Sequence, residues 1–432
     1  MFVRCKAKKL KTAQKLILGF IFFIILGGVL LSLPISHEQG APLSVFDAFF
    51  LSVSAVCVTG LSPVNCSITF SLFGRIVLAC LMQIGGLGYA TFAVLLLVML
   101  RQKVAFSQRN LAKEALNLET GRGIVGLVKL VIGSSLILES AGTLLLFIVF
   151  RPHFATARQA LGMGVFHAIS AFNNAGLDLL GNSFSDYHDN VLLNLTITTL
   201  IVCGGIGFFV ISDVLSAKKW RRFAFHTKVV LSFSFALILI GTVLLRLCCP
   251  ISTLEAFFLS VTSRTAGFNT VDTAAIGTKG LIITIVLMFI GASPGSTGGG
   301  IKTTTFFTVL VALRAIATGH EPSAFCRKIT TDSILKAFTV ITFSLLVLVL
   351  AIFGISAFEG TRFSLLSLVF EAISAFATVG LSCGVTGSLG IPSKFILMLL
   401  MFIGRIGPLT IASSLNSKER HLHYVEEHII IG

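Results

Sequence analysis

Four short stretches that end in glycine and a large apolar residue carry the residues best suited to bind an ion. They occupy residues 54–61, 170–177, 261–268 and 374–381. A cation stripped of water needs oxygen ligands, and backbone carbonyls can supply them where glycine permits dihedral angles closed to other residues. None of the stretches contains a carboxylate. The sequence therefore predicts an ion site lined by Val58, Thr59, Gly60, Asn174, Ala175, Gly176, Thr265, Ala266, Gly267, Thr378, Val379 and Gly380.

The surroundings of these stretches indicate what positions them. Each follows an apolar run that contains phenylalanine and is too short to cross a bilayer, and longer apolar runs lie on either side. Irregular backbone at membrane depth persists only where it is packed in protein or lines a wet cavity, so a re-entrant pore helix is expected before each glycine. Ser-Ala-Phe and Gly-Leu also occur in ordinary membrane helices. Four copies in matching context favour a ring of pore loops.

The composition indicates an integral membrane protein. Of the 432 residues, 55% are hydrophobic and only 12% are charged. A net charge of +15 would favour nucleic acid as the partner of a soluble chain. Here most of the Lys and Arg gather in residues 1–15, 101–129, 218–228, 314–336 and the tail after residue 417. The positive-inside rule makes these segments cytoplasmic and therefore places both termini inside. The number of crossings must then be even. Because the placement of the basic residues explains the net charge, no nucleic acid partner is expected.

The predicted fold is an all-α membrane protein with four pseudo-symmetric helix–pore loop–helix repeats around a central pore. Its expected segments are a cytoplasmic N-terminal segment 1–15, repeats 16–100, 101–213, 214–315 and 316–416, and a cytoplasmic tail 417–432. Two spans enclose one pore helix in each repeat, which gives eight crossings. The predicted helices are 16–34, 44–57, 73–100, 125–150, 160–172, 189–212, 228–249, 253–263, 280–313, 333–356, 364–376 and 393–415. The first of these is too long for a signal peptide and is interpreted as a retained helix.

A second motif recurs in the last span of three repeats. It reads Gly-Gly-Leu-Gly at residues 85–88, Gly-Gly-Ile-Gly at 204–207 and Gly-Arg-Ile-Gly at 404–407. Arg405 thus replaces a glycine at a depth where a charge costs several kcal/mol unless it faces water or a partner. Two interpretations follow. Arg405 is either a structural arginine bonded to loose carbonyls or a positive charge below the ion site that forms a local barrier to cations.

The third repeat has a glycine-rich segment, residues 291–302, at the same place. Glycine and proline cannot sustain a regular helix there, so the span is expected to break. The segment lacks the spacing of a phosphate-binding loop and lies between membrane spans. It is predicted to be a flexible plug beneath the ion site, with a plain kink as the alternative. The residues of this predicted gate are Gly291, Ala292, Ser293, Pro294, Gly295, Ser296, Thr297, Gly298, Gly299, Gly300 and Lys302, together with Arg405.

The remaining reactive residues do not predict an enzyme. Nine cysteines are scattered without metal-ligand spacing and are interpreted as apolar filler, although outside disulfides involving the pairs Cys57 and Cys66 or Cys248 and Cys249 stay open. Titratable residues in the apolar runs are isolated, and capping or packing of pore helices is expected of Glu139, His167, Glu255 and Glu371. A secondary transporter with inverted repeats is the main alternative, but it would not place basic loops with the same orientation after every pair of spans.

The motifs together resemble the Trk/Ktr/HKT potassium transporters. The four glycine stretches resemble the selectivity filters of that family, and residues 295–302 and 404–408 resemble its broken helix and its arginine-bearing helix. The likeness covers almost the whole chain. It is greatest to the KtrB type, the membrane subunit of a bacterial potassium uptake system, because no extra helix pair precedes the first repeat and the tail is short.

This resemblance implies potassium uptake across the cytoplasmic membrane through a pore in each subunit of a homodimer. It implies that Gly60, Gly176, Gly267 and Gly380 set the preference for potassium. A cytosolic ring of nucleotide-binding RCK subunits, of the KtrA/TrkA-like type, is the implied partner besides membrane lipid. Potassium is the transported ion, sodium is a candidate coupling or stimulating ion, and no cofactor is expected on this chain. Pro294 departs from the small residues usual in the gating loop.

Overall fold

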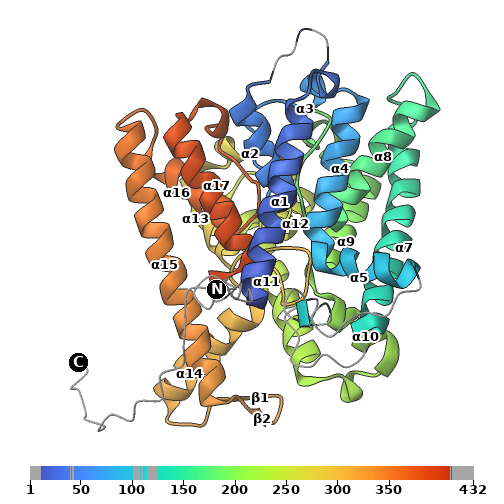
Figure 1. Cartoon of the computed structure of the whole chain (residues 1–432). Helices are drawn as coiled ribbons and strands as arrows, with labels where there is room; N and C mark the ends of the chain where they lie inside the picture. Colours follow the sequence, from blue (N-terminus) through green and yellow to red (C-terminus); the bar gives the residue numbers. More distant parts are fainter. Residues whose placement is uncertain are drawn as a thin grey trace, which may run out of the picture.

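The computed structural model describes residues 11–38, 40, 43–100, 108, 110, 111, 113, 124–408 and 410. Within this part the protein is mostly helical, and the long helices stand side by side (Figure 1). Three predicted basic segments fall largely outside it, namely the residues before 11, most of the loop at 101–129 and the tail after 417. Their orientation therefore remains a prediction.

We keep the word repeat for each of the four segments predicted from the sequence, whose pseudo-symmetry stays a prediction. The first repeat holds α1 (Thr12–Ser32), α2 (Val45–Val56), α3 (Cys66–Thr69), α4 (Leu72–Leu87) and α5 (Tyr89–Met99), and the second holds α7 (Ile124–Phe150), α8 (Ala157–Phe172), α9 (Val191–Gly205) and α10 (Phe208–Ala217). The third holds α11 (Phe225–Cys248), α12 (Thr253–Thr262), α13 (Gly277–Phe289) and α14 (Thr303–Thr318), and the fourth holds α15 (Thr331–Glu359), α16 (Leu365–Phe376) and α17 (Ile391–Ile406). A hairpin of β1 (Ser323–Ala324) and β2 (Arg327–Lys328), which was not predicted, joins α14 to α15 at the lower end in Figure 1.

Four of the described helices are long and apolar enough to cross a membrane. These are α1, α7, α11 and α15, and the number rises to six if each of two bent helix pairs counts as one span. Only 22% to 28% of each long apolar window is buried inside the protein, so most of its side chains are available to lipid. The chain is therefore a membrane protein with several apolar spans, while the count of eight crossings stays a prediction.

The four short apolar helices begin at hydroxyl residues that cap them. Side-chain oxygens of Ser44, Thr156, Ser252 and Ser364 accept a hydrogen bond from the backbone amide three residues later, which satisfies a free donor of the first turn. At α12 the carboxylate of Glu255 returns a bond to the amide of Ser252, so its predicted capping role is confirmed. The short helices predicted before each glycine are therefore present as α2, α8, α12 and α16, within a few residues of the expected bounds, and we call them the pore helices after their predicted role.

The last helices of the repeats are broken rather than straight. The axis bends by 92° between α4 and α5 and by 95° between α9 and α10. Gly88 and Gly207 lie at these bends with φ of 80° and 94°, and Gly407 ends α17 with φ of 91°. Such dihedrals interrupt an α-helix and strongly favour glycine. The predictions of continuous helices at 73–100, 189–212 and 393–415 were therefore wrong in this respect, whereas the break in 280–313 is confirmed by the irregular stretch between α13 and α14.

Contacts between successive repeats close into a circle. Helix α4 packs against α8, α9 against α12, α13 against α16, and α17 against α2. The last of these contacts includes an ion pair between Lys394 Nζ and Asp47 Oδ1 at 3.1 Å. Both side chains are largely buried, so this pair links the first and fourth repeats away from bulk water. The buried core lies where the four pore helices converge.

Candidate functional site

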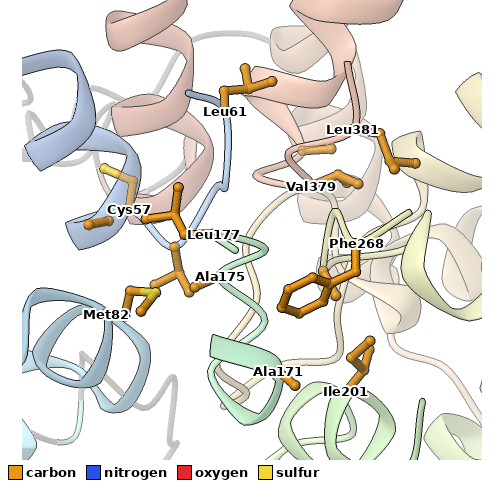
Figure 2. Packing of buried hydrophobic residues seen from close by; sticks show 14 of the residues in the cluster. Cys57, Leu61, Met82, Ala171, Ala175, Leu177, Ile201, Phe268, Val379 and Leu381 are labelled. Atoms are coloured by element: carbon orange, nitrogen blue, oxygen red, sulfur yellow. The ribbon is translucent and has the colours of Figure 1, made fainter. Parts of the chain in front are cut away.

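The four predicted stretches meet at the centre of the molecule. We call residues 58–60, 174–176, 265–267 and 378–380 the ring loops, and each follows the end of a pore helix. Their glycines have φ values of 99°, 68°, 74° and 92° in chain order. The apolar residue after each glycine belongs to one buried cluster, and Figure 2 shows these residues as Leu61, Leu177, Phe268 and Leu381.

The ring loops touch one another in chain order and close a ring. A methyl group added to Gly60 would meet the carbonyl oxygen of Ala175 in the next loop. The same addition at the other three glycines would strike the corresponding carbonyl of the following loop, namely Ala266 for Gly176, Val379 for Gly267 and Thr59 for Gly380. Glycine is therefore required at each position both by its dihedral angles and by the close approach of the neighbouring backbone.

The carbonyl oxygens of the ring loops lack hydrogen-bond donors. None of the twelve accepts a hydrogen bond from another described residue. Ten of the twelve residues are fully or almost fully buried, and only Gly60 and Gly380 are partly exposed. Buried backbone carbonyls nearly always accept a hydrogen bond. A group of carbonyls without donors at one place therefore indicates a ligand-binding site. Oxygens of this kind can replace the water around a cation.

The first and fourth ring loops are built alike. In the first, the amide of Thr59 donates to the carbonyl of Ser54 at 2.8 Å, and the amide of Gly60 donates to the Ser54 hydroxyl at 3.0 Å. In the fourth, Val379 and Gly380 donate to the carbonyl and hydroxyl of Ser374 at 2.9 Å and 3.1 Å. One serine near the end of each pore helix thus fixes two consecutive loop amides.

The third ring loop has a different construction. Val261 occupies the position of the serines, and the amide of Ala266 donates instead to the carbonyl of Thr262 at 2.9 Å. Arg264 precedes this loop and is buried, with one guanidinium nitrogen donating to the hydroxyl of Ser234 at 3.3 Å. The side chains of Asn174 and Thr265 lie 3.0 Å apart and connect this loop to the second one.

The glycine-rich segment, residues 291–302, lies against the ring loops. The amide of Gly299 donates to the hydroxyl of Thr378, a ring-loop residue, at 2.9 Å. The amides of Ser293 and Thr297 donate to the last carbonyls of α9, and that of Gly300 donates to the carbonyl of Gly404 in α17 at 3.2 Å. This segment therefore bridges the second and fourth repeats by backbone bonds, while few of its side chains bury apolar surface.

Two basic side chains hold the glycine-rich segment. Lys302 Nζ donates to the carbonyl of Gly298 at 2.7 Å, as expected of an anchor. The guanidinium of Arg405 donates to the carbonyls of Thr297, Gly85 and Gly86. Arg405 lies in the last turn of α17 rather than at mid-helix, and it joins the glycine motif of the first repeat to the segment of the third. These bonds are what the first of the two interpretations of Arg405 expects, while its role as a barrier to cations stays a prediction.

A cavity of about 310 Å³ opens below this layer. Its walls contain residues of the glycine-rich segment, the glycine motifs and Arg405, including Gly86, Pro294, Ser296, Lys302, Gly404 and Arg405. The predicted gate residues therefore lie together, between the ring loops and this cavity. Ile301 and Thr303, which were not among the predicted gate residues, belong to the same layer because they bond to Gly291, Ala292 and Ser293.

Other polar groups near the ring were underestimated from the sequence. Glu139 accepts a hydrogen bond from the side-chain amide of Gln83 at 2.9 Å, and Nδ2 of Asn173 donates to Oε1 of Gln83 at 2.6 Å. Asn173 ends the second pore helix, so this network supports the start of the second ring loop. Lone polar residues within apolar runs were the available signal. Among the described residues, Cys57, Cys66, Cys248 and Cys249 are free thiols.

Comparison with known proteins places this geometry in a family. The profile of the TrkH family, described as cation transport proteins, matches residues 9–251 and 242–419. The chain is 40% identical to the Ktr system potassium uptake protein B of Bacillus subtilis, over 97% of this chain and 96% of that protein. It is 36% identical to the potassium/sodium uptake protein NtpJ of Enterococcus hirae, over 98% of both.

A solved structure supports the same assignment at the level of the fold. The crystal structure of the potassium transporter TrkH from Vibrio parahaemolyticus superposes with a TM-score of 0.72 at 20% identity, covering 96% of this chain and 87% of that chain. The profile extends over most of the sequence and both relatives are matched along nearly their full length. This chain therefore belongs to the TrkH family of cation transport proteins.

Proposed function

We propose that this protein takes up potassium through the ring loops, which act as its selectivity filter. The observation that carries the proposal is the set of twelve buried or half-buried carbonyl oxygens that no described residue bonds. Carbonyl rings of this kind select among alkali cations by the number and field of their dipoles. The name of the Bacillus subtilis relative, a potassium uptake protein, supports potassium as the ion, and that of NtpJ, a potassium/sodium uptake protein, supports sodium as a second transported or stimulating ion.

The same proposal orients the chain in a cytoplasmic membrane. The four repeats form a pseudo-symmetric unit of eight crossings, with the pore helices entering from outside and the hairpin of β1 and β2 inside. Both termini are cytoplasmic by this arrangement, in keeping with the basic residues at 218–228 and 314–336. The working unit is a homodimer in membrane lipid, regulated by a cytosolic ring of nucleotide-binding subunits. The name "Ktr system" of the relatives supports such partners.

The glycine-rich segment and Arg405 form the gate in this proposal. Ions that leave the filter would have to pass the layer formed by the segment before reaching the cavity below. Arg405 adds a positive charge to that layer and ties it to two other repeats. The segment is held mainly by backbone hydrogen bonds and small residues, so it can rearrange at modest cost in free energy.

Ion uptake by proteoliposomes that contain the purified protein tests this function. Potassium, rubidium and sodium are compared, each against empty liposomes and against liposomes with an unrelated membrane protein. We expect uptake of potassium and rubidium to exceed that of sodium. Equal uptake of all three ions, or uptake of none above the controls, would contradict the proposal.

A further inference from the structure

One buried position of the pore helices alternates between an apolar and a polar residue from one repeat to the next. It lies three residues before the serine position of each pore helix and holds Leu51, His167, Phe258 and Glu371. All four side chains are at most 1% exposed. The polar ones belong to the second and fourth repeats, which lie opposite one another because the ring loops contact each other in chain order. Polar residues so deeply buried need partners.

Glu371 is bonded to the segment that follows the fourth ring loop. Its carboxylate accepts hydrogen bonds from the Ser382 hydroxyl, from the amide of Cys383 at 3.1 Å and from the Thr386 hydroxyl at 2.9 Å. We call residues 382–386 the fourth mouth segment. It begins two residues after Gly380, so Glu371 connects the pore helix to the residues that directly follow the fourth ring loop.

His167 makes the equivalent connection in the second repeat. Its Nδ1 lies 2.8 Å from the carbonyl of Met163, which can only accept, so Nδ1 carries the proton. Its Nε2 therefore accepts from the amide of Leu179 at 3.4 Å. Leu179 belongs to the second mouth segment, residues 178–181, and lies twelve residues after His167, as Cys383 does after Glu371.

In the first and third repeats, the residues that follow the ring loop are bonded to groups outside the pore helix of that repeat. After the third ring loop, the amide of Asn269 donates to the Ser183 hydroxyl at 2.9 Å, and its carbonyl accepts from the amide of Phe184 at 2.8 Å. After the first, the Ser62 hydroxyl donates to the carbonyl of Val64 within the same turn. The segments that follow the first and third ring loops therefore need no hydrogen bond from the pore helix, which agrees with the apolar Leu51 in α2 and Phe258 in α12.

From these contacts we infer that Glu371 and His167 are positioning residues for ion selectivity. Each holds a mouth segment by a side chain anchored in a pore helix, and thereby holds two opposing ring loops at a fixed separation. A ring with fixed separation keeps the number and field of its carbonyls constant when the ion changes, which is a condition for discrimination. This inference rests on the proposed role of the ring loops as the filter.

The test compares Glu371→Gln with Glu371→Leu in the potassium and sodium uptake assay. Glutamine retains an acceptor for Ser382 and Cys383 and can donate to the Thr386 hydroxyl. Leucine leaves the amide of Cys383 without an acceptor, and the hydroxyls of Ser382 and Thr386 then have only each other, at 3.1 Å. A buried donor without a partner costs at least about 1 kcal/mol, which is about a fivefold change in an equilibrium ratio. We therefore expect Glu371→Gln to keep the wild-type ratio and Glu371→Leu to lower it about fivefold. His167→Gln and His167→Leu should differ in the same direction.

A matched control is Glu359→Leu. Glu359 is also a buried carboxylate of the fourth repeat, and it accepts from the amide of Gly390 at 2.8 Å, away from the ring loops. Its removal should lower thermal stability but leave the ion ratio unchanged. If Glu371→Leu cannot be purified, the pair Ser382→Ala and Thr386→Val removes two donors while keeping the carboxylate, and a reduced ratio is expected again.

The outcomes separate this inference from the proposed function. A wild-type protein that takes up potassium and sodium equally would overturn the proposed filter itself. A selective wild type whose ratio is unchanged in Glu371→Leu, or in the double variant, would overturn the positioning role alone. Equal loss of selectivity in Glu359→Leu would show that general destabilisation is responsible, which also overturns it.

Discussion

The first and third ring loops differ in backbone conformation and in the hydrogen bonds that hold their amides. Residue 58 in the first loop has a left-handed conformation with φ of 57°, and Ser54 fixes the two amides that follow. The third loop lacks both features and has a buried arginine in front of it. Both loops bond to the pore helix of their own repeat, but the third loop also bonds to the second one through the side chains of Thr265 and Asn174.

This difference coincides with a second one in the same repeats. The first repeat continues from α4 to α5 through a single glycine bend, while the third inserts the irregular residues 290–302 between α13 and α14. The segment bonds to the fourth ring loop and to helices of the second and fourth repeats. The irregular residues 290–302 thus set the third repeat apart, and they are the element to which we assign the proposed gate.

The largest effect is expected from a side chain on a ring glycine. In Gly380→Ser the new Cβ would strike the carbonyl of Thr59 at a φ of 92°, and strain of this kind costs about 1–3 kcal/mol. We expect the potassium-to-sodium uptake ratio to fall about tenfold or more, since about 1.4 kcal/mol corresponds to tenfold. Gly60→Ser should behave alike.

Gly360→Ser is the control for this prediction. Gly360 lies in the same repeat with φ of 58°, but an added Cβ would have no neighbour within 4 Å. It follows the end of α15, so the substitution imposes a similar backbone penalty outside the ring loops and the fourth mouth segment. Comparable loss of selectivity in Gly360→Ser, or wild-type discrimination in both ring variants, would refute the requirement for glycine in the filter.

Removal of residues 292–299 should produce the next largest effect. Gly291 and Gly300, which the deletion would join, are already adjacent, because a Cβ added to Gly291 would lie 3.3 Å from the Cα of Gly300. Helices α13 and α14 can then keep their places. We expect a folded dimer whose potassium flux is about tenfold faster and responds less to nucleotide on the cytosolic partner, because regulatory coupling is typically about 1–3 kcal/mol.

Flux measurements with and without the partner and its nucleotide check this prediction. Size-exclusion chromatography of the deletion variant establishes that the dimer persists. Unchanged flux, or a full response to nucleotide, would leave the segment as a kink in the third repeat without a gating role.

Local signals in the sequence were sufficient for the pore helices and the ring. Hydroxyl caps such as Ser364 and the glycine that ends each stretch act within one or two helical turns, so their consequences are readable from the chain alone. Repetition made the ring predictable, because four similar loops separated by similar spans must occupy similar places. The individual dihedrals and the order of contacts around the ring needed the structure.

Long-range partners were beyond sequence reasoning. Arg405 bonds to carbonyls that lie 108, 319 and 320 residues earlier in the chain, and nothing near residue 405 identifies them. The bends at Gly88 and Gly207 were missed for a related reason. Glycine inside an apolar run is compatible with a continuous membrane helix, and packing of the surrounding repeats decides whether the chain turns there.

A smaller effect is expected when Arg405 is changed. Arg405→Ala removes three bonds to carbonyls of the first and third repeats, so the glycine-rich segment loses a tether but keeps its backbone bonds to α9 and α17. We expect potassium flux to rise about fivefold, less than for the deletion, because coupling of this kind is about 1 kcal/mol. Flux in proteoliposomes measures it.

Arg405→Lys decides which property of the arginine matters. Lysine keeps the charge but lacks the planar fork that reaches several carbonyls. If the charge forms a barrier, this variant should conduct like the wild type, and if the bonds hold the segment, it should conduct like Arg405→Ala. An Arg405→Ala protein that is less stable and no faster would restrict the residue to a structural role.

The smallest effect should come from the serines that distinguish the first and fourth loops from the third. Ser374→Ala removes the hydroxyl that accepts from the amide of Gly380, and the net loss for such a bond is about 1 kcal/mol. We expect a slightly lower melting temperature and a fall of about two- to threefold in the potassium-to-sodium uptake ratio. Val261→Ser in the third loop is the reciprocal change, and it should improve neither property because the amide of Ala266 already has a backbone partner in Thr262. A gain in selectivity from Val261→Ser would mean that the third loop lacks only a hydroxyl, and that its side-chain contact with the second loop is not the feature that sets it apart.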